Sequence, residues 1–460
     1  MPLATSIQRQ LDDLQTEYTL SSTAPADSAN VEPRSLNSCL VKSVILKDHS
    51  GRIQLLLPAH RAVNLGAISR ASGRQFQGVT IKEVLAMIEP LELSMLPAVP
   101  LWREVPLFVD SSISRYPTLL LESGSQDELL EIKQDDFTAL TNGCIVGDFS
   151  KRLFRLESDP CKDSAQIQNS VQHFTSLRVR ERLEETLDLP PLPKTAQDII
   201  QLRANPDADI SDLSDIIEVD PSLAAQVVSW AGSPYYSAPG KIRSVHDAIV
   251  RVLGFDMVLN LALGLALGRT MSHKAMTNEQ ITDYWHTAVI TAATVEGLVT
   301  AISREHRPSY GMSYLCGLLS NFGTLILAEV FPPHFAKVSK CISANQHLAG
   351  ASIEQDVLGV TGNQMAAWLL DNWNLPTEVV TGIRQQNNLN YNGEHAVYAK
   401  LIYVAQTLLG NHGVGHPLGG PLPQRLFEAL HLDRETAEIT VENVLDSCEE
   451  LEQIAEQIKA

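Results

Sequence analysis

Cysteine is scarce in this chain, with six in 460 residues. None of the six stands in a C-x-x-C motif or in another close pair. The sequence therefore offers neither a disulfide framework nor a zinc knuckle. Scattered single thiols are typical of a protein kept in a reducing compartment, so we predict a cytoplasmic protein.

Positive charge is also in short supply. The chain has 35 Lys and Arg against 54 Asp and Glu, a formal net charge of −19. Residues 1–155 hold 15 basic and 18 acidic residues (net −3), which leaves 20 and 36 (net −16) for residues 156–460. Because phosphate recognition needs clustered cations, we expect no DNA partner. Arg61, Arg70, Arg74 and Lys82 could form a small basic patch, or be scattered solvated cations.

The chain offers little that would suit a membrane. Its first residues are polar and amphipathic, without the apolar core of a signal peptide, so none is predicted. The stretch 308–328 carries no charge, but proline, glycine and polar residues interrupt it. A bilayer span needs about 20 predominantly apolar residues. We therefore interpret 308–328 as a buried helix of a helical domain.

The pattern of residues 1–155 predicts a mixed α/β domain. Apolar and polar residues alternate in short runs that are bounded by Gly, Pro and Asp, as is typical of strands. A polar segment follows a first helix and reaches to about residue 35. The expected strands are 39–46 and 52–58, which form a β-hairpin with Gly51 in the turn, and 105–113, 117–125 and 128–132. The expected helices are 1–16, 62–73 and 80–89.

After residue 155 the strand pattern fades and helical periodicity replaces it. We predict a linker over 156–184, an all-helical domain over 185–440 and a C-terminal helix over 441–460. Asp209 and Ser211 are candidate caps, and Asp220-Pro221 predicts a helix start. The fold class is thus a multidomain α+β protein, and we expect its two parts to fold separately.

The helical part contains several spaced motifs. They are Leu189–Pro193, Ile216–Leu223, Ala248-Ile249 with Leu253-Gly254, Gly317–Leu319 with Phe322-Gly323, and Trp373–Pro376. Together they resemble the HDOD domain, an all-helical relative of the HD metal-dependent phosphohydrolases that is found in bacterial signalling proteins. The resemblance implies a signal-transduction role through protein partners.

The resemblance also implies that the metal site is lost. In the hydrolases His-Asp follows Gly-Leu-Leu, and here Ser320-Asn321 follows it. Later ligand positions fall on Gly362 and on 385–387, a run of two glutamines and an asparagine. Hydroxyl and amide groups cannot replace imidazole and carboxylate ligands. We therefore predict no metal and no cofactor in this position, and consider a phosphohydrolase the third and last hypothesis.

Two histidines outside these motifs could be considered as metal ligands. His246-Asp247 is the only His-Asp dipeptide, but it opens a helix far from the motif and supplies too few ligands. We interpret it as a capping or surface pair. His286, next to Trp285, is likewise interpreted as a core or hydrogen-bonded histidine rather than as a ligand.

Lys42 is the candidate functional residue of the N-terminal part. Side chains alternate along a strand, so Lys42 shares a face with Leu40, Val44 and Leu46. A lysine among apolar neighbours either recognises a carbonyl or carboxylate group or extends to solvent from the sheet edge. Alternation alone does not decide between the two.

The N-terminal part contains a second set of motifs. They are Val41–Val44, Leu56–Pro58, Val63–Leu65, Val105–Asp110 and Ser123–Ser125. In this order they resemble the YbaK/prolyl-tRNA-synthetase-associated domain, whose members include editing deacylases for mischarged tRNA. The resemblance implies that Lys42 lines an aminoacyl pocket and that Gly124, followed by Ser125, shapes it. It also implies that Pro97 corresponds to a loop proline, although the glycines of that loop are absent over 89–100.

These observations support two main hypotheses. The first is a regulatory protein whose YbaK-like module senses a small molecule or an aminoacyl group while the metal-free HDOD module relays it. The second is a trans-editing aminoacyl-tRNA deacylase with Lys42 as catalytic residue, tRNA as partner and HDOD as scaffold. Under either hypothesis, Lys42→Ala is expected to remove binding or deacylation while the fold stays intact.

Overall fold

The structure is a computed structural model that describes residues 5–13, 16–22, 38–102, 104–125, 128–153, 159–174, 191–238, 240–271, 275–415 and 422–459. Two compact units make up the chain. The first contains the described residues of 1–156, 337–357 and 416–423, and the second contains those of 157–336, 358–415 and 424–460. The division after residue 156 lies where the sequence pattern changes. The membership of 337–357 in the first unit differs from the predicted continuous helical domain.

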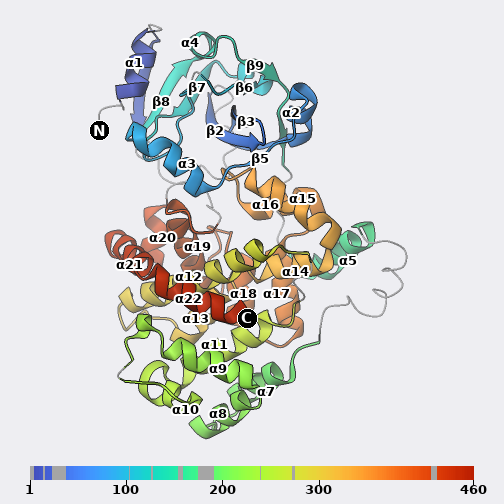
Figure 1. Ribbon diagram of the computed structural model, residues 1–460, viewed down its shortest axis with the longest axis vertical. Coiled ribbons are helices and arrows are strands. Elements are labelled where there is room, and N and C mark those ends of the chain that lie inside the picture. Colours follow the sequence, from blue (N-terminus) through green and yellow to red (C-terminus); the bar gives the residue numbers. More distant parts are fainter. Residues whose placement is uncertain are drawn as a thin grey trace. The chain divides into compact units, whose positions relative to one another are not determined.

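A mixed β-sheet forms the centre of the first unit (Figure 1). Its strand order is β1-β8-β7-β2-β3-β6-β9, and β5 also pairs with β2; β4 and β10 form a separate two-stranded sheet. Strands β7 and β2 are parallel, as are β3, β6 and β9, whereas β2 and β3 form the predicted antiparallel hairpin. The strands are β1 (Tyr18–Ser22), β2 (Ser38–Asp48), β3 (Gly51–Pro58), β4 (Arg61–Val63), β5 (Gln77–Gly78), β6 (Leu107–Asp110), β7 (Thr118–Glu122), β8 (Glu128–Lys133), β9 (Ile145–Gly147) and β10 (Ser150–Arg152).

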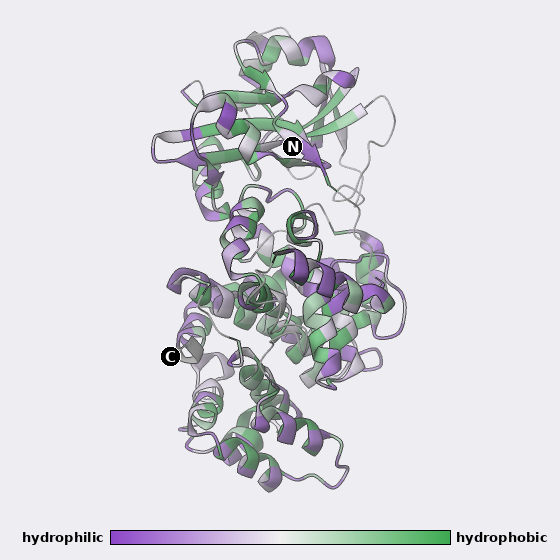
Figure 2. Ribbon diagram, turned by 90° about the vertical axis from the view of Figure 1, so that its right-hand side faces the viewer, coloured by the Kyte–Doolittle hydropathy of each residue, from purple (hydrophilic) through white to green (hydrophobic). Residues whose placement is uncertain are grey.

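Alternation along the strands gives the sheet two apolar faces. Cys39 and Val41 face one core cluster, which also contains Phe137 of helix α4 (Gln134–Leu140). Val44 and Leu46 face a second cluster, which contains Ile68 of helix α2 (Leu65–Ser72). The predominantly hydrophobic colouring of the strands in Figure 2 agrees with a sheet that is covered on both sides.

The helices of the first unit follow the predicted pattern closely. Helix α1 spans Thr5–Asp13, and α2 ends at Gly73, whose positive φ of 70° closes the helix. Helix α3 (Ile81–Ile88) ends before Pro90. The polar segment predicted after the first helix is wrong over 18–22, where β1 pairs with β8; residues 23–37 lie outside the described part. Strands β9 and β10 and helix α4 were not predicted.

The segment 337–357 packs on the first unit although the predicted helical domain contains it. It joins the end of α15 (Pro332–Ser343) to most of α16 (Gly350–Leu358), and Figure 1 shows α16 beside β5. The buried Asn345 accepts a hydrogen bond from the backbone N–H of Val63 at 2.7 Å. The side chain of Gln346 donates to the carbonyl of Val79. A Cβ at Gly78 would overlap the backbone of Ser343, so only glycine fits this contact.

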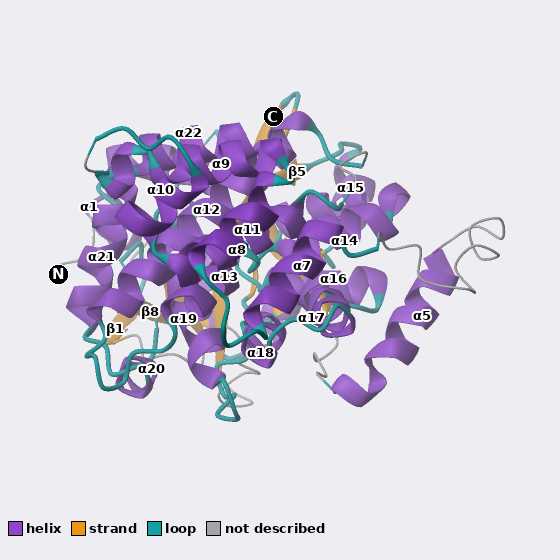
Figure 3. Ribbon diagram, turned by 90° about the horizontal axis from the view of Figure 1, so that it is seen from below, coloured by secondary structure: helices purple, strands orange, loops and turns teal. Residues whose placement is uncertain are grey.

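Helices make up the second unit almost entirely (Figure 3). The long central helix α12 packs against α13, α19, α21 and α22. The helices that lie in this unit are α5 (Asp163–Phe174), α7 (Lys194–Arg203), α8 (Ile210–Glu218), α9 (Pro221–Ala231), α10 (Val245–Ala248), α11 (Phe255–Gly268), α12 (Asn278–Ala301), α13 (Tyr310–Leu318), α14 (Phe322–Val330), α17 (Gly362–Asn372), α18 (Thr377–Gln385), α19 (Ala396–Asn411), α20 (Gln424–Ala429), α21 (Arg434–Asp446) and α22 (Cys448–Lys459).

The predicted helix starts at Asp209 and Asp220-Pro221 are confirmed, whereas Ser211 is not a cap, because it is the second residue of α8. The carboxylate of Asp209 accepts from the backbone of Ser211 and Asp212 at the start of α8, and Asp220 caps α9, whose first residue is Pro221. The prediction of one helix over 308–328 is wrong, because α13 and α14 are separate helices. Tyr310–Val330 is the one candidate membrane span within the described residues, and 83% of its most apolar window is buried inside the protein.

Part of the predicted linker forms a helix that packs within the second unit. Helix α5 packs against α17, and the buried carboxylate of Asp163 pairs with Arg384, whose side chain is 11% exposed. Gln364 donates a second hydrogen bond to Asp163 at 2.8 Å. Residues 156–158 and 175–184 of the predicted linker, and Leu189-Pro190 of the first HDOD motif, lie outside the described residues.

Candidate functional site

Lys42 lies on β2 and forms an ion pair with Glu122 at the end of β7. The two strands are parallel, and Val41 lies opposite Leu121. The residues that follow them, Lys42 and Glu122, therefore lie side by side on the other face of the sheet. The side chain of Lys42 is 21% exposed and that of Glu122 is 6% exposed. The lysine therefore points neither into bulk solvent nor into an apolar core, because its ammonium group pairs with the carboxylate of Glu122.

The charge of this pair depends on both partners. Burial raises the pKa of Glu122 above its ordinary value, and the nearby ammonium group of Lys42 opposes that rise. A ligand carbonyl or carboxylate at Lys42 would have to compete with Glu122. Alternatively, it would have to bind while Glu122 is protonated.

Gly124, Ser125 and Pro97 lie around one loop that follows α3. The carbonyl of Gly124 accepts from the backbone N–H groups of Ser94 and Met95 at 3.0 and 3.2 Å, and a Cβ at Gly124 would overlap Leu93. Pro97 is buried in the same loop, and Ser125 donates its backbone N–H to Ser123. Glu92, with φ of 57°, makes the tight bend without the glycines that the family carries there.

Glu122 connects this loop to Lys42. Its carboxylate pairs with Lys42, whereas its backbone carbonyl accepts from Ala98 at 2.9 Å. Ala98 and Val99 belong to the core cluster of Val41, so the loop packs on the face opposite to Lys42. The predicted residues thus meet at the end of β7 but approach it from the two faces of the sheet. A shared aminoacyl pocket stays a prediction.

A cavity of about 420 Å³ lies elsewhere in the first unit, where α2 and β4 meet the segment 337–357. Lys151, Lys337 and Lys340 line it, and Lys151 pairs with Asp356. Cys341 lies among these charges, which act in opposite directions on its thiol, although burial dominates and raises the pKa of Cys341. The formal charge of the three lysines and Asp356 is +2, so the lining favours an anionic group. The sequence did not predict this site, because the lining residues before 152 and those in 337–357 are about 190–300 positions apart in the chain.

Two of the four cations in the predicted basic patch form polar contacts within the first unit. The guanidinium of Arg61 donates to the hydroxyl of Ser150 at 2.6 Å, and Arg74 pairs with the buried Asp48. That pairing holds the pKa of Asp48 well below its usual range. The remaining cations of the patch, Arg70 and Lys82, do not by themselves form a nucleic-acid surface.

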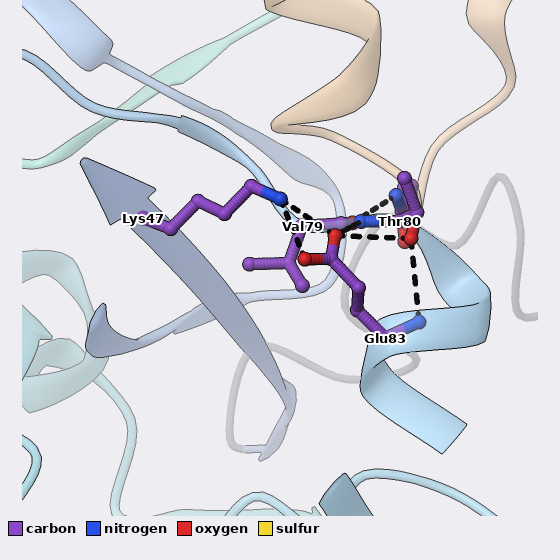
Figure 4. A network of polar contacts seen from close by, with 5 residues as sticks. Lys47, Val79, Thr80 and Glu83 are labelled. Atoms are coloured by element: carbon purple, nitrogen blue, oxygen red, sulfur yellow. Dashed lines mark hydrogen bonds and ion pairs between the residues drawn. The ribbon is translucent and has the colours of Figure 1, made fainter. Parts of the chain in front are cut away.

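An ion pair also anchors the start of α3 beside the segment 337–357 (Figure 4). Lys47 donates to both oxygens of Glu83 at 2.6 and 2.7 Å, and Glu83 completes a capping box with Thr80. The hydrogen bonds from Lys47 are the main cause that lowers the pKa of Glu83 to about 2. The carbonyl of Val79, next to this cap, is the group that accepts from Gln346.

The position of the lost HD site contains amide and carbonyl groups. Ser320 and Gln386 are buried, and Gln386 donates to the carbonyl of Ser320 at 2.9 Å. Asn321 donates to the carbonyl of Tyr284. Gly362 packs against the backbone of Gly323, where a side chain would not fit. The structure thus brings the predicted positions together as helix contacts, and none of these groups has the chemistry of a strong metal ligand.

Both special histidines lie where the sequence placed them. His246 is exposed, and Asp247 accepts from the backbone of Arg243 and lies 3.6 Å from Arg251, as expected of a surface pair. His286 contacts Cys448 and Glu452, and its predicted lack of a ligand role stays a prediction. The six cysteines, all within the described residues, form no disulfide.

Comparisons with known proteins agree with the two sets of motifs. Residues 19–140 match the aminoacyl-tRNA editing domain and residues 189–389 match the HDOD domain. A crystal structure from Marinobacter aquaeolei VT8, of a protein provisionally named as a signal transduction protein, is 37% identical with a TM-score of 0.83, and the match covers 100% of both chains.

Two more distant relatives add detail. An HDOD domain protein of unknown function from Geobacter sulfurreducens is 18% identical with a TM-score of 0.50 over 64% of this chain and 99% of that one, which supports the fold alone. An uncharacterized protein of Treponema pallidum (strain Nichols) is 25% identical over 272 residues, 58% of this chain and 51% of the relative. The chain thus spans about half the length of this curated relative. It belongs to the family of proteins in which an aminoacyl-tRNA editing (YbaK-like) domain is followed by an HDOD domain.

Proposed function

We propose that this chain is a regulatory protein whose first unit binds a small ligand and whose helical unit passes that binding on to protein partners. The observation that carries the proposal is the segment 337–357, which lies inside the HDOD match but belongs to the compact unit of the editing-like domain. Because the chain continues from this segment into the second unit at both ends, a change in the packing of 337–357 acts directly on the HDOD helices.

The ligand in this proposal carries an anionic group. The lysine-lined cavity lies where β4, α2 and β10 of the first unit meet 337–357, so a ligand bound there would touch both sides. A phosphate or carboxylate group suits Lys337 and Lys340, which have no opposite charge beside them other than Asp356 among the lining residues. An aminoacylated nucleotide combines such a group with the acyl chemistry of the editing family.

The test uses the full-length protein and a non-hydrolysable aminoacyl-adenosine phosphate, in which an amide replaces the ester. We expect the compound to bind and to change amide hydrogen exchange over 337–357. The Lys337→Ala/Lys340→Ala variant should lose most of this binding, whereas Lys162→Ala, at an exposed lysine of the second unit, should keep it. Binding without any change over 337–357 would contradict the proposed relay.

The deacylase hypothesis is tested in parallel with a panel of mischarged tRNAs. The editing-domain match over residues 19–140 favours it, whereas the pairing of Lys42 with Glu122 leaves the lysine less available to a substrate. Turnover by the wild type that is lost in Lys42→Met/Glu122→Gln, a variant that leaves no unpaired buried charge, would establish an enzyme. Under the regulatory proposal we expect no turnover above the rate without protein.

A further inference from the structure

Three side chains of different chemistry meet where helix α22 packs on α12. His286 projects from α12, and Cys448 and Glu452 project from α22. Nε2 of His286 lies 3.5 Å from Sγ of Cys448 and 3.1 Å from Oε1 of Glu452. Sγ of Cys448 lies 3.8 Å from the same carboxylate oxygen. The cluster belongs to the second unit alone and shares no residue with the lost HD position at Ser320-Asn321, Gly362 and 385–387.

The triangle formed by these atoms has the size of one face of a tetrahedral zinc site. Zinc binds nitrogen at about 2.0–2.1 Å, sulfur at about 2.3 Å and carboxylate oxygen at about 2.0–2.2 Å, so tetrahedral angles give separations of about 3.4–3.6 Å between ligand atoms. The three observed separations, 3.1, 3.5 and 3.8 Å, differ from these values by about 0.3 Å or less. Small rotations of the side chains would therefore suffice to close around an ion.

The local structure favours the ionised ligands. Cys448 is the first residue of α22, where the positive end of the helix dipole stabilises a thiolate. Glu452 lies one turn later on the same face of the helix. Buried Leu451 and Ile454 hold α22 in place, while the Glu452 side chain is 53% exposed and that of His286 is 17% exposed. The site is thus rigid on one side and open to solvent on the other.

We propose that Nε2 of His286, Sγ of Cys448 and a carboxylate oxygen of Glu452 bind one zinc ion, with water as the fourth ligand. Three protein ligands with an open fourth position are typical of zinc sites that exchange a water or bind a substrate. On binding, the Cys448 thiol and any protonated imidazole of His286 release their protons to solvent, so affinity rises with pH. The ion would link the C-terminal helix to the centre of the HDOD helices.

The experiment uses full-length protein stripped with a chelator and then titrated with zinc, or with cobalt(II) as a coloured substitute. We expect one equivalent of zinc per chain, a thiolate-to-cobalt charge-transfer band and a higher melting temperature with zinc. Cys448→Ser should abolish the band and weaken zinc binding by about 100-fold or more, and His286→Gln and Glu452→Gln by about 10- to 100-fold. Circular dichroism confirms that each variant is folded.

Two matched controls locate the ion. Cys161→Ser removes an exposed thiol of the second unit, and Ser320→Ala alters the position of the lost HD site. Both should bind zinc as the wild type does. A wild type without the charge-transfer band, or zinc that is retained with unchanged affinity in Cys448→Ser, would overturn the proposal and leave the three side chains as a hydrogen-bonded cluster.

Discussion

Lys42 and Glu122 lie side by side on parallel strands, so each residue determines what the other can do. The Glu122 side chain is only 6% exposed. Removing its partner therefore leaves a buried carboxylate without a counter-ion, which is strongly destabilising. Lys42→Ala is therefore expected to destabilise the protein, contrary to the prediction that its fold stays intact. Functional tests of Lys42 need a variant that also neutralises Glu122.

We predict that Lys42→Met lowers the free energy of unfolding by about 2–4 kcal/mol, because Glu122 loses its counter-ion. The double variant Lys42→Met/Glu122→Gln should regain most of this loss, since no buried charge remains. Urea denaturation followed by circular dichroism measures both. A double variant that is as unstable as the sum of the two single variants would show that the pair is not coupled.

Glu296 gives the helical unit a pH-dependent stability. Its carboxylate accepts from the hydroxyl of Tyr236 at 3.1 Å, and burial raises its pKa from 4.5 to about 7. The folded state therefore holds one more proton than the unfolded state between these two pH values. Stability contributed by this proton is present below pH 4.5 and is lost as pH rises toward 7.

We predict that Glu296→Gln removes this dependence. For one proton the wild-type free energy of unfolding falls by up to about 1.4 kcal/mol per pH unit relative to the variant, and the difference levels off above pH 7. Urea denaturation at pH 5, 6, 7 and 8 measures it, with Glu305→Gln, at an exposed position, as control. A difference between wild type and Glu296→Gln that is constant with pH would contradict the assignment.

Single residues also mark the limit of what the sequence could predict. Alternation along one strand placed Lys42 correctly on its face. The partner Glu122 could not be predicted, because it depends on the register of two strands whose residues are 80 positions apart. His286 and Cys448 are 162 positions apart for the same reason. Local sequence patterns predict the face on which a side chain lies, whereas its contact partners depend on the fold.

Elements with strong local signals were predictable. The hairpin β2–β3, the glycine that ends α2 and the aspartate caps of α8 and α9 all follow from residues next to each other in the chain. Strand β1 was missed because its five residues, Tyr18–Ser22, are mostly polar and form an edge strand that depends on β8. The break between α13 and α14 was missed because only two uncharged polar residues, Ser320 and Asn321, interrupt the apolar pattern there.

Helix α5 shows that the predicted linker contributes to stability. We predict that Asp163→Ala lowers the free energy of unfolding of the full chain by about 3–5 kcal/mol, because Arg384 is then left buried without its partner. The exposed pair of Lys194 and Asp198 provides the control, and Lys194→Ala should cost less than about 1 kcal/mol. Equal effects of the two substitutions in thermal denaturation would contradict a structural role for α5.

For the whole molecule, the two sequence families do not coincide with the two compact units. The editing-like unit includes 337–357, and the helical unit includes α5 from the predicted linker. We therefore predict that a fragment of residues 185–460 melts at a lower temperature than one of residues 159–460, because it lacks α5. Differential scanning calorimetry compares them, and equal melting temperatures would show that α5 is dispensable.

The proposed relay depends on the segment 337–357, and a substitution at Gly78 would disturb the packing of this segment. Gly78 has no positive φ, so Gly78→Ala introduces little backbone strain, but its Cβ would overlap the carbonyl of Ser343. Gly66→Ala in α2 is the matched control, since its Cβ meets only ordinary contacts at 3.5 Å or more.

The decisive measurement is amide hydrogen exchange of full-length wild type, Gly78→Ala and Gly66→Ala. We predict that Gly78→Ala accelerates exchange over 337–357 and in the neighbouring β4, and that Gly66→Ala leaves both regions as in the wild type. Unchanged exchange over 337–357 in Gly78→Ala would show that this segment does not depend on the editing-like unit, and would contradict the account.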